Sequence, residues 1–89
     1  MATAAGYVLS DGYRIWGIGE TLHKARCDAR NEGAYLDHDG EELDDWIDYL
    51  RVMPATAALM AAARQDRWTS YRRLSGGVWG TPAEYEAEQ

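Results

Sequence analysis

Residues 37–50 read DHDGEELDDWIDYL and combine a dense run of acidic residues with a regular spacing of apolar residues. The apolar residues fall at i, i+3, i+4 and i+7, which places them on one side of a helix: Leu43, Trp46, Ile47 and Leu50. Seven carboxylates lie among them with no lysine or arginine: Asp37, Asp39, Glu41, Glu42, Asp44, Asp45 and Asp48. The pattern predicts a helix that docks its apolar side on a core and presents an acidic face.

Part of this acidity has a local structural explanation. Asp39 and Glu42, three residues later, fit a capping box, and acids in a first helical turn also meet the positive end of the helix dipole. The later acids, Asp44, Asp45 and Asp48, lie too far along the helix for that explanation. We therefore expect the functional surface to be this later group together with Glu41.

The net charge of −6 is unevenly distributed along the 89 residues. Residues 28–48 carry a net charge of −8, whereas residues 49–73 carry +4. Acidity of this kind keeps a small protein soluble. It also disfavours direct nucleic-acid binding, because neutralising phosphates requires an excess of lysine and arginine. The natural complement is a basic protein or ribonucleoprotein complex of the host.

Length and composition predict a single small domain over residues 1–89, with residues 1–5 disordered. Four Trp and six Tyr, without any Phe, supply the bulk of the core and suit a contact surface. Cys27 is the only cysteine, so an internal disulfide is excluded. Since the sequence contains neither a signal peptide nor an 18-residue apolar run, we expect a soluble cytoplasmic protein without membrane contact. A monomer and a homodimer are both compatible with the sequence.

The first structural unit is a predicted β-hairpin. Asp11 and Gly12 lie between apolar runs at residues 7–9 and 13–18, which is a strong signal for a two-residue type I′ turn. Gly17 and Gly19 weaken the second strand, and a bulge or the close approach of another backbone would explain them.

A helix is expected to follow the hairpin. Thr21 is a good N-cap, the helix runs to about Glu32, and Gly33 supplies a left-handed C-terminal residue. Its inward face is mostly alanine, including Ala25 and Ala29. Small residues allow a helix to lie close against a sheet, so we expect it to pack across the hairpin.

The remaining segments predict alternating strands and helices. Residues 34–36 form a short connection, and residues 50–53 form a strand because Met53 precedes Pro54. Pro54 opens a helix with an apolar stripe of Leu59, Met60 and Ala63. Residues 67–74 and 78–80 form a second hairpin. Residues 82–89 form a short acidic helix, capped by Thr81 and Glu84. The fold class is α+β, a mainly antiparallel sheet of four or five strands with helices packed on one face.

Residues 7–32 resemble the first half of HicB-type antitoxins. The resemblance rests on the hairpin followed by Gly19, Glu20, Thr21, Leu22, Ala25, Asp28 and Ala29. His23 and Lys24 depart from the family, which usually has two acids there, and nothing after Leu74 is similar to its DNA-binding module. In size, acidity and layout the chain is also similar to small phage-borne anti-CRISPR proteins, which occupy basic nucleic-acid-binding surfaces. That likeness has no motif behind it.

No catalytic or cofactor motif is present in the sequence. His23 and Cys27 lie four residues apart, but no second pair has ligand spacing, and only His38 with Asp37 and Asp39 could complete a metal site. Counting from Asp37 places a glycine fourth and an acid twelfth, which does not fit a calcium loop. The glycines match no phosphate-binding loop. We therefore expect a binding protein without enzymatic activity, metal or other cofactor.

Two contact surfaces follow from these patterns. In the first, the acidic residues dock on the basic surface of a nucleic-acid-handling protein and block it, and an aromatic centre slows release: Trp16, Tyr35, Trp68 or Trp79. The HicB-type alternative is neutralisation of a small RNase toxin. The second surface is a basic and aromatic patch that would stack on single-stranded nucleic acid: Arg64, Arg67, Trp68, Tyr71, Arg72 and Arg73. The simpler interpretation of these arginines is that they pair with the protein's own acids or face solvent on an edge strand.

Overall fold

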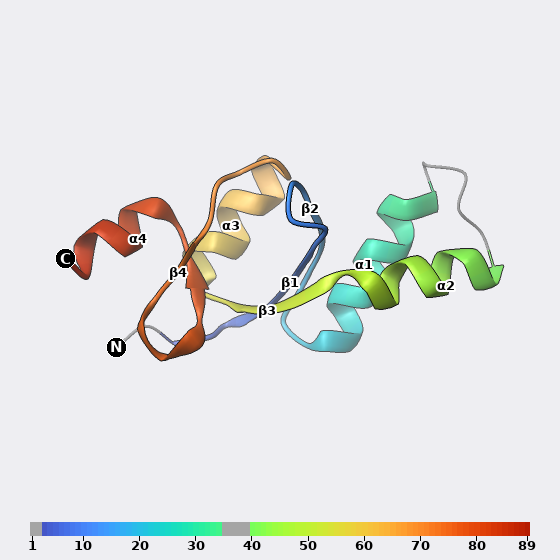
Figure 1. Cartoon of the computed structure of the whole chain (residues 1–89), viewed down its shortest axis with the longest axis horizontal. Coiled ribbons are helices and arrows are strands. Elements are labelled where there is room, and N and C mark those ends of the chain that lie inside the picture. Colours follow the sequence, from blue (N-terminus) through green and yellow to red (C-terminus); the bar gives the residue numbers. More distant parts are fainter. Residues whose placement is uncertain (1–2, 35–39) are drawn as a thin grey trace.

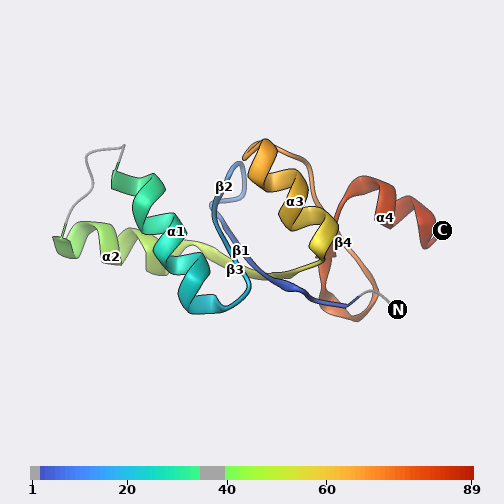
Figure 2. The same ribbon diagram turned by 180° about the vertical axis from the view of Figure 1, so that it is seen from behind.

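The computed structural model describes residues 3–34 and 40–89, and for residues 34 and 40–42 it describes the backbone alone. The helices and strands follow one another along the chain in the order β1 (Gly6–Ser10), β2 (Ile15–Gly19), α1 (Leu22–Ala34), α2 (Gly40–Tyr49), β3 (Arg51–Ala55), α3 (Ala57–Gln65), β4 (Arg72–Arg73), η1 (Ser75–Gly77), β5 (Trp79–Gly80) and α4 (Pro82–Ala87). The molecule is elongated, with extents of 44 × 20 × 17 Å. Helices α1 and α2 form one end and α4 forms the other (Figure 1 and Figure 2).

The five strands form one sheet in the order β2-β1-β3-β5-β4. Three of the four neighbouring pairs are antiparallel, and β3 and β5 are parallel through Ala55 and Trp79. The predicted α+β class with a mainly antiparallel sheet is therefore confirmed, with one parallel pair. That pair arises because α3 and β4 lie between β3 and β5 in the chain, and β4 runs antiparallel to β5.

Helices cover both faces of the sheet, and not one face as expected. Consecutive strand residues point to opposite faces. Val8 lies in a buried cluster with Leu59 and Met60 of α3, whereas Leu9 lies in a second cluster with Leu43 and Ile47 of α2. Ala25 and Ala29 of α1 belong to the second cluster as well. The two-sided cover follows from β1, whose successive residues Val8, Leu9 and Ser10 are all buried.

The first hairpin is confirmed, but its turn is longer than predicted. Ser10 pairs with Ile15, so residues 11–14 form a four-residue loop. The Asp11 carboxylate holds this loop, because its Oδ1 accepts hydrogen bonds of 2.8 Å from the backbone N–H groups of both Tyr13 and Arg14. Gly12 supplies the positive φ of 99° that this path requires. An aspartate that caps two amides thus replaces the tight turn that Asp-Gly alone indicated.

Glycines allow the first helix to pack closely on both of its neighbours. A Cβ on Gly17 would lie 2.3 Å from the carbonyl oxygen of Ala25, which confirms the predicted close approach of another backbone. Gly33 was expected to end α1 in the left-handed conformation. In the structure it lies inside the helix. A Cβ there would lie 2.5 Å from the Trp46 ring and 2.7 Å from Leu43. This glycine therefore serves the contact between α1 and α2.

The central part of the chain agrees with the expected strand and helix, except at Pro54. The strand predicted at residues 50–53 is β3, and it pairs with β1 along its whole length. Pro54 lies within β3 and does not open the next helix. Thr56 caps α3, because its Oγ1 accepts a hydrogen bond from the N–H of Leu59. The predicted stripe of Leu59, Met60 and Ala63 is buried.

The C-terminal region forms the second hairpin in a shorter form. β4 comprises only Arg72 and Arg73, and residues 67–71 are not a strand. The capping box of Thr81 and Glu84 is present, and the predicted final helix ends at Ala87. Glu84 Oε1 also accepts a 2.6 Å hydrogen bond from Thr56 Oγ1. Since α4 contains no buried residue, this contact is a main attachment of the helix to the domain.

Candidate protein-binding site

The acidic helix α2 is amphipathic, as its sequence predicted. Leu43, Ile47 and Leu50 are buried in the cluster beneath α1 and β1. Trp46 is half-buried, and its ring meets that of Trp16 edge to face with the centroids 4.9 Å apart. The apolar side of the helix is thus fixed by packing, and the carboxylates of Asp44, Asp45 and Asp48 are exposed.

Two of these carboxylates have partners within the fold. Arg26 Nη2 donates to Asp48 Oδ1 at 2.7 Å, and Arg30 forms an ion pair with Asp44. The expectation that the fold would leave Asp44 and Asp48 unexplained is therefore wrong, because α1 supplies their counter-charges. Asp45 is exposed and has no ion pair with any residue that the structure describes.

The sequence did contain a signal for this seam between α1 and α2. Arg26 and Arg30 are four residues apart, as are Asp44 and Asp48, so each pair lies on one side of its own helix. Two such helices packed side by side can match their charges in register. The signal becomes readable only when the two helices are known to be neighbours.

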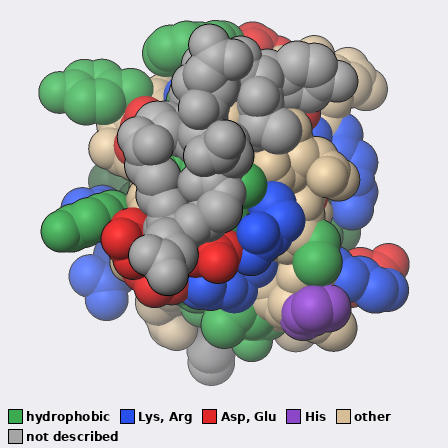
Figure 3. Space-filling model, turned by 90° about the vertical axis from the view of Figure 1, so that its right-hand side faces the viewer, with side chains coloured by type: hydrophobic (Ala, Val, Ile, Leu, Met, Phe, Trp, Pro, Cys, Tyr) green, Lys and Arg blue, Asp and Glu red, His purple; other side chains and the backbone are tan. Residues whose placement is uncertain are grey.

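The stretch that contains both ion pairs is acidic in sequence, although Arg14 and Arg67 from outside it also pair with its Glu32 and Asp28. Residues 20–48 contain ten acidic and three basic residues, a net charge of −7, so the remaining residues together carry +1. Side chains of the two pairs are between 41 and 64% exposed, and exposed pairs of this kind contribute only about 0–1 kcal/mol each. Figure 3 shows acidic and basic side chains next to each other on this end. Asp44 and Asp48 thus remain accessible to another cation.

Several predicted site residues lie outside the described part of the structure. Tyr35, Asp37 and Asp39 belong to residues 35–39. Glu41 and Glu42 lie in α2, but their side chains are also outside it. The capping box predicted for Asp39 and Glu42 therefore stays a prediction.

The aromatic candidates differ in their exposure. Trp16 is half-buried, with the Arg14 guanidinium 4.0 Å above its ring centre. Trp79 is also half-buried and packs edge to face on Tyr71 beside the α3 cluster. Trp68, in contrast, is 66% exposed. Two aromatic residues that the sequence did not single out, Tyr13 and Tyr49, are more exposed still. Each lies two residues before the start of a strand, a position for which the sequence shows no pattern.

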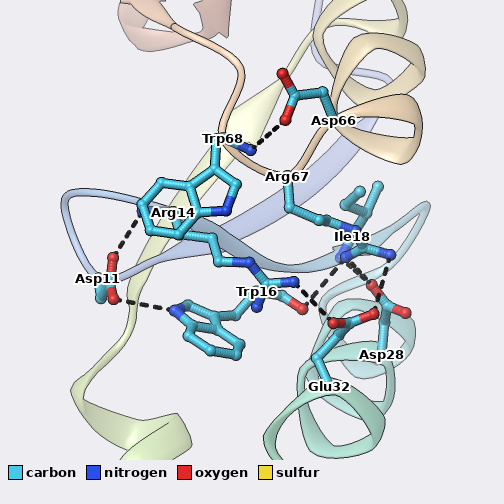
Figure 4. A network of polar contacts seen from close by, with 9 residues as sticks. All are labelled: Asp11, Arg14, Trp16, Ile18, Asp28, Glu32, Asp66, Arg67 and Trp68. Carbon is cyan, nitrogen blue, oxygen red and sulfur yellow. Dashed lines mark hydrogen bonds and ion pairs between the residues drawn. The ribbon is translucent and has the colours of Figure 1, made fainter.

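Arg67 belongs to a structural network and not to a basic patch. Its Nη1 lies 2.7 Å from Asp28 Oδ2, and its Nη2 lies 3.7 Å from Glu32 Oε1. Arg14 Nη2 reaches the other oxygen of Glu32 at 2.9 Å. In Figure 4 both arginines point toward these carboxylates of α1. Pairing with the protein's own acids, the simpler interpretation, is confirmed for Arg67.

The other arginines of the predicted patch have separate surroundings. Arg64 of α3 lines a shallow hollow with Ala5 and Glu20, whereas Arg72 and Arg73 are exposed on the edge strand β4. A charged, two-residue edge strand protects a sheet from pairing with other chains. Arg67 is therefore taken up by its own acid partners, and a nucleic-acid patch of the remaining residues stays a prediction.

The Asp11 carboxylate is the one described group with a resolved change in acidity. Burial by itself would raise its pKa, but hydrogen bonds from the backbone of Arg14 and Tyr13 and from Trp16 Nε1 lower the pKa overall. These donors favour the charged form of the carboxylate. Asp11 is thus a fixed anion that organises the hairpin loop, and all its contacts are structural.

The described residues show no metal or membrane chemistry. Among them, no group of three or more His, Cys, Asp or Glu side chains is arranged to hold a metal ion. Cys27 Sγ lies 3.6 Å from His23 Nε2, which confirms that these two residues share a face of α1. None of the helices in the described ranges has the length and apolar character to span a membrane.

Comparison with known proteins gives no relative. No protein-family model matches the chain, and neither a curated protein nor a solved structure matches it.

Proposed function

We propose that this protein is a stoichiometric inhibitor that docks α2 on the basic surface of a nucleic-acid-handling protein or complex, in the manner of an anti-CRISPR protein. The observation that carries the proposal is the net charge of −7 over residues 20–48, combined with the exposed carboxylates of Asp44, Asp45 and Asp48. These carboxylates compete with phosphates for the lysines and arginines of the partner.

The ion pairs with α1 are compatible with this action. Each is solvent-exposed and worth only about 0–1 kcal/mol, so an arginine of a partner can replace Arg26 or Arg30 at small cost. Asp45 needs no such exchange. The acidic end also attracts a basic partner over a distance, which increases the rate of encounter at low salt.

Asp45 is the position that tests the proposal most cleanly. Reversing Asp44 or Asp48 would also place two cations together at the seam with α1, whereas Asp45→Lys breaks no described contact. Glu86→Lys on α4 makes the same charge change at an exposed position without a described ion pair.

The experiment is capture of host proteins on immobilised wild type, Asp45→Lys and Glu86→Lys at low and high salt. The proposal requires a nucleic-acid-handling protein that binds wild type and Glu86→Lys, is lost with Asp45→Lys, and elutes as salt rises. Equal capture by Asp45→Lys, or capture that salt does not weaken, would contradict it.

Antitoxin action is the second candidate, because residues 7–32, whose sequence resembles HicB-type antitoxins, fold as a hairpin followed by a helix. Under this hypothesis the sheet and α1 cover a small RNase toxin. It requires a small basic reading frame beside the gene, and co-expression of that product must be toxic alone and harmless with this chain. The absence of such a reading frame would exclude it.

A further inference from the structure

Three exposed aromatic residues lie around the end of the sheet where the first hairpin turns. Tyr13 is 82% exposed, Tyr49 is 89% exposed and Trp68 is 66% exposed. We call these three residues the hairpin-end patch. These residues belong neither to the acidic face of α2 nor to the buried core, so neither of those features accounts for their exposure.

Strand pairing places the three residues at the same end. Ser10 pairs with Ile15 of β2 on one side and with Arg51 of β3 on the other. Neighbouring strands are about 4.8 Å apart, so Ile15 and Arg51 are separated by roughly 10 Å. Tyr13 precedes Ile15 by two residues, and Tyr49 precedes Arg51 by two.

Trp68 joins this end through its neighbour Arg67. The N–H of Ile15 donates a 2.8 Å hydrogen bond to the carbonyl oxygen of Arg67. Trp68 is thus held next to the hairpin loop, and in the view of Figure 4 its ring overlaps Arg14. The patch therefore runs from the outer edge of β2 across the loop to the start of β3.

The exposed area of the three residues is comparable to that of the largest apolar patch on a typical monomer. Each aromatic side chain offers 150–250 Å², so the three residues together leave on the order of 500 Å² exposed at these fractions. The largest apolar patch on a typical monomer is about 300–600 Å² and is often functional. A standard interface needs about 800 Å² from each partner, and the patch supplies more than half of that.

Charges beside the patch are arranged for a copy of the same chain. Arg51, at the β3 side, is exposed and has no ion pair with any described residue. Asp66, beyond β2, is exposed, and its described side-chain contact is through Oδ1, which accepts from the N–H of Trp68. In a twofold interface a residue at one side of a patch meets the residue at the other side of the second copy, twice.

We propose that two copies of this chain form a twofold dimer through the hairpin-end patch, with Arg51 of each copy facing Asp66 of the other. The aromatic side chains form the centre of the interface and the two charge pairs form its rim. This assembly is independent of the inhibitory function, because it does not use Asp45.

Sedimentation velocity over a hundredfold range of concentration tests the dimer. Wild type must show a species of twice the 10.0 kDa chain mass that grows with concentration, and Tyr13→Ser with Trp68→Ser must abolish it. Tyr85→Ser, an aromatic change on α4 away from the patch, must leave the dimer intact. A wild type that stays monomeric, or a dimer that survives the double substitution, overturns the proposal.

Charge exchange tests the twofold arrangement itself. Arg51→Asp alone and Asp66→Arg alone must each weaken the dimer at least tenfold in Kd, and the two together must restore it within about threefold. Circular dichroism and the urea midpoint of each variant establish that it is folded. If the combined variant dimerises no better than the single ones, the pairing of Arg51 with Asp66 is wrong.

Discussion

Arg67 Nη1 lies 2.7 Å from Asp28 Oδ2, and this contact ties the segment after α3 to α1 across the outer edge of β2. The same carboxylate oxygen accepts a 2.9 Å hydrogen bond from the N–H of Ile18. Arg67 also donates to the carbonyl oxygen of Trp16 at 3.3 Å. The edge of β2 is thus closed by side chains and a passing backbone, which prevents another strand from adding there.

Replacing Arg67 with Met should therefore destabilise the protein by about 1–3 kcal/mol, because Asp28 loses a charge-assisted partner in a half-buried position. Arg26→Met removes an arginine from the exposed pair with Asp48 and should cost less than about 1 kcal/mol. Urea unfolding measures both. Equal midpoints for the two variants would show that the Arg67 network adds no more than a surface ion pair.

Gly17→Ala tests the close packing of α1 on β2. Its new Cβ would lie 2.3 Å from the backbone oxygen of Ala25. Such overpacking lowers the free energy of unfolding by about 3 kcal/mol. Gly12→Ala introduces the same methyl group where no atom lies within 4 Å, but at a φ of +99°, so we expect about 1–2 kcal/mol from backbone strain alone. A Gly17→Ala protein as stable as Gly12→Ala would contradict the packing described for α1.

The lowered pKa of Asp11 makes the stability of the hairpin loop pH-dependent. A carboxyl group whose pKa is lower in the folded state stabilises the fold at pH values above its unfolded pKa of about 3.9, and this contribution is lost as the pH falls through the folded pKa. Asp11→Asn should cost about 1 kcal/mol at pH 7 and should flatten the decline of stability below about pH 4. Thermal unfolding between pH 7 and pH 2.5 checks this, and parallel pH profiles for wild type and variant would refute it.

Glu84 should control the attachment of α4. Its Oε1 accepts from Thr56 Oγ1 at 2.6 Å and from the N–H of Thr81 at 3.0 Å, while no residue of α4 is buried. Glu84→Ala should lose about 1–2 kcal/mol locally, so that amide hydrogens in α4 exchange roughly tenfold faster while those of β1 are unchanged. Glu86→Ala is the matched control. Unchanged exchange in Glu84→Ala would show that other contacts hold the helix.

The sequence predicted elements whose signals are local. Periodic apolar residues predicted α2 and α3, glycines at positions 17 and 19 predicted a bulge or a close backbone approach, of which the structure shows the second, and Thr81 with Glu84 predicted the start of the last helix. Predictions from the sequence were wrong where the position of a residue depends on packing against another helix. In the sequence Gly33 resembles a helix end. In the structure it lies inside α1, because the Trp46 ring leaves no space for a Cβ at that position. Two-sided burial of β1 likewise depends on both α2 and α3.

The acidic charge of the candidate site could be predicted from the sequence, but its ion pairs with α1 could not. The sequence located the acids of α2, but only the packing of α1 beside α2 showed that Arg26 and Arg30 face Asp48 and Asp44. The same holds for Arg67, whose acid partner Asp28 lies 39 residues away. The matching four-residue spacings of Arg26 and Arg30 and of Asp44 and Asp48 could be interpreted only once α1 and α2 were known to be neighbours, so Asp45 was identified as the test position only from the structure.

Displacement of nucleic acid tests the central claim most directly. The protein captured by wild type is bound to a fluorescently labelled nucleic acid and titrated with wild type, Asp45→Lys or Glu86→Lys while anisotropy is recorded. The proposed function predicts complete release at one equivalent of wild type or Glu86→Lys, and at least tenfold weaker release by Asp45→Lys. Nucleic acid that stays bound at excess wild type, or equal release by all three proteins, would contradict it.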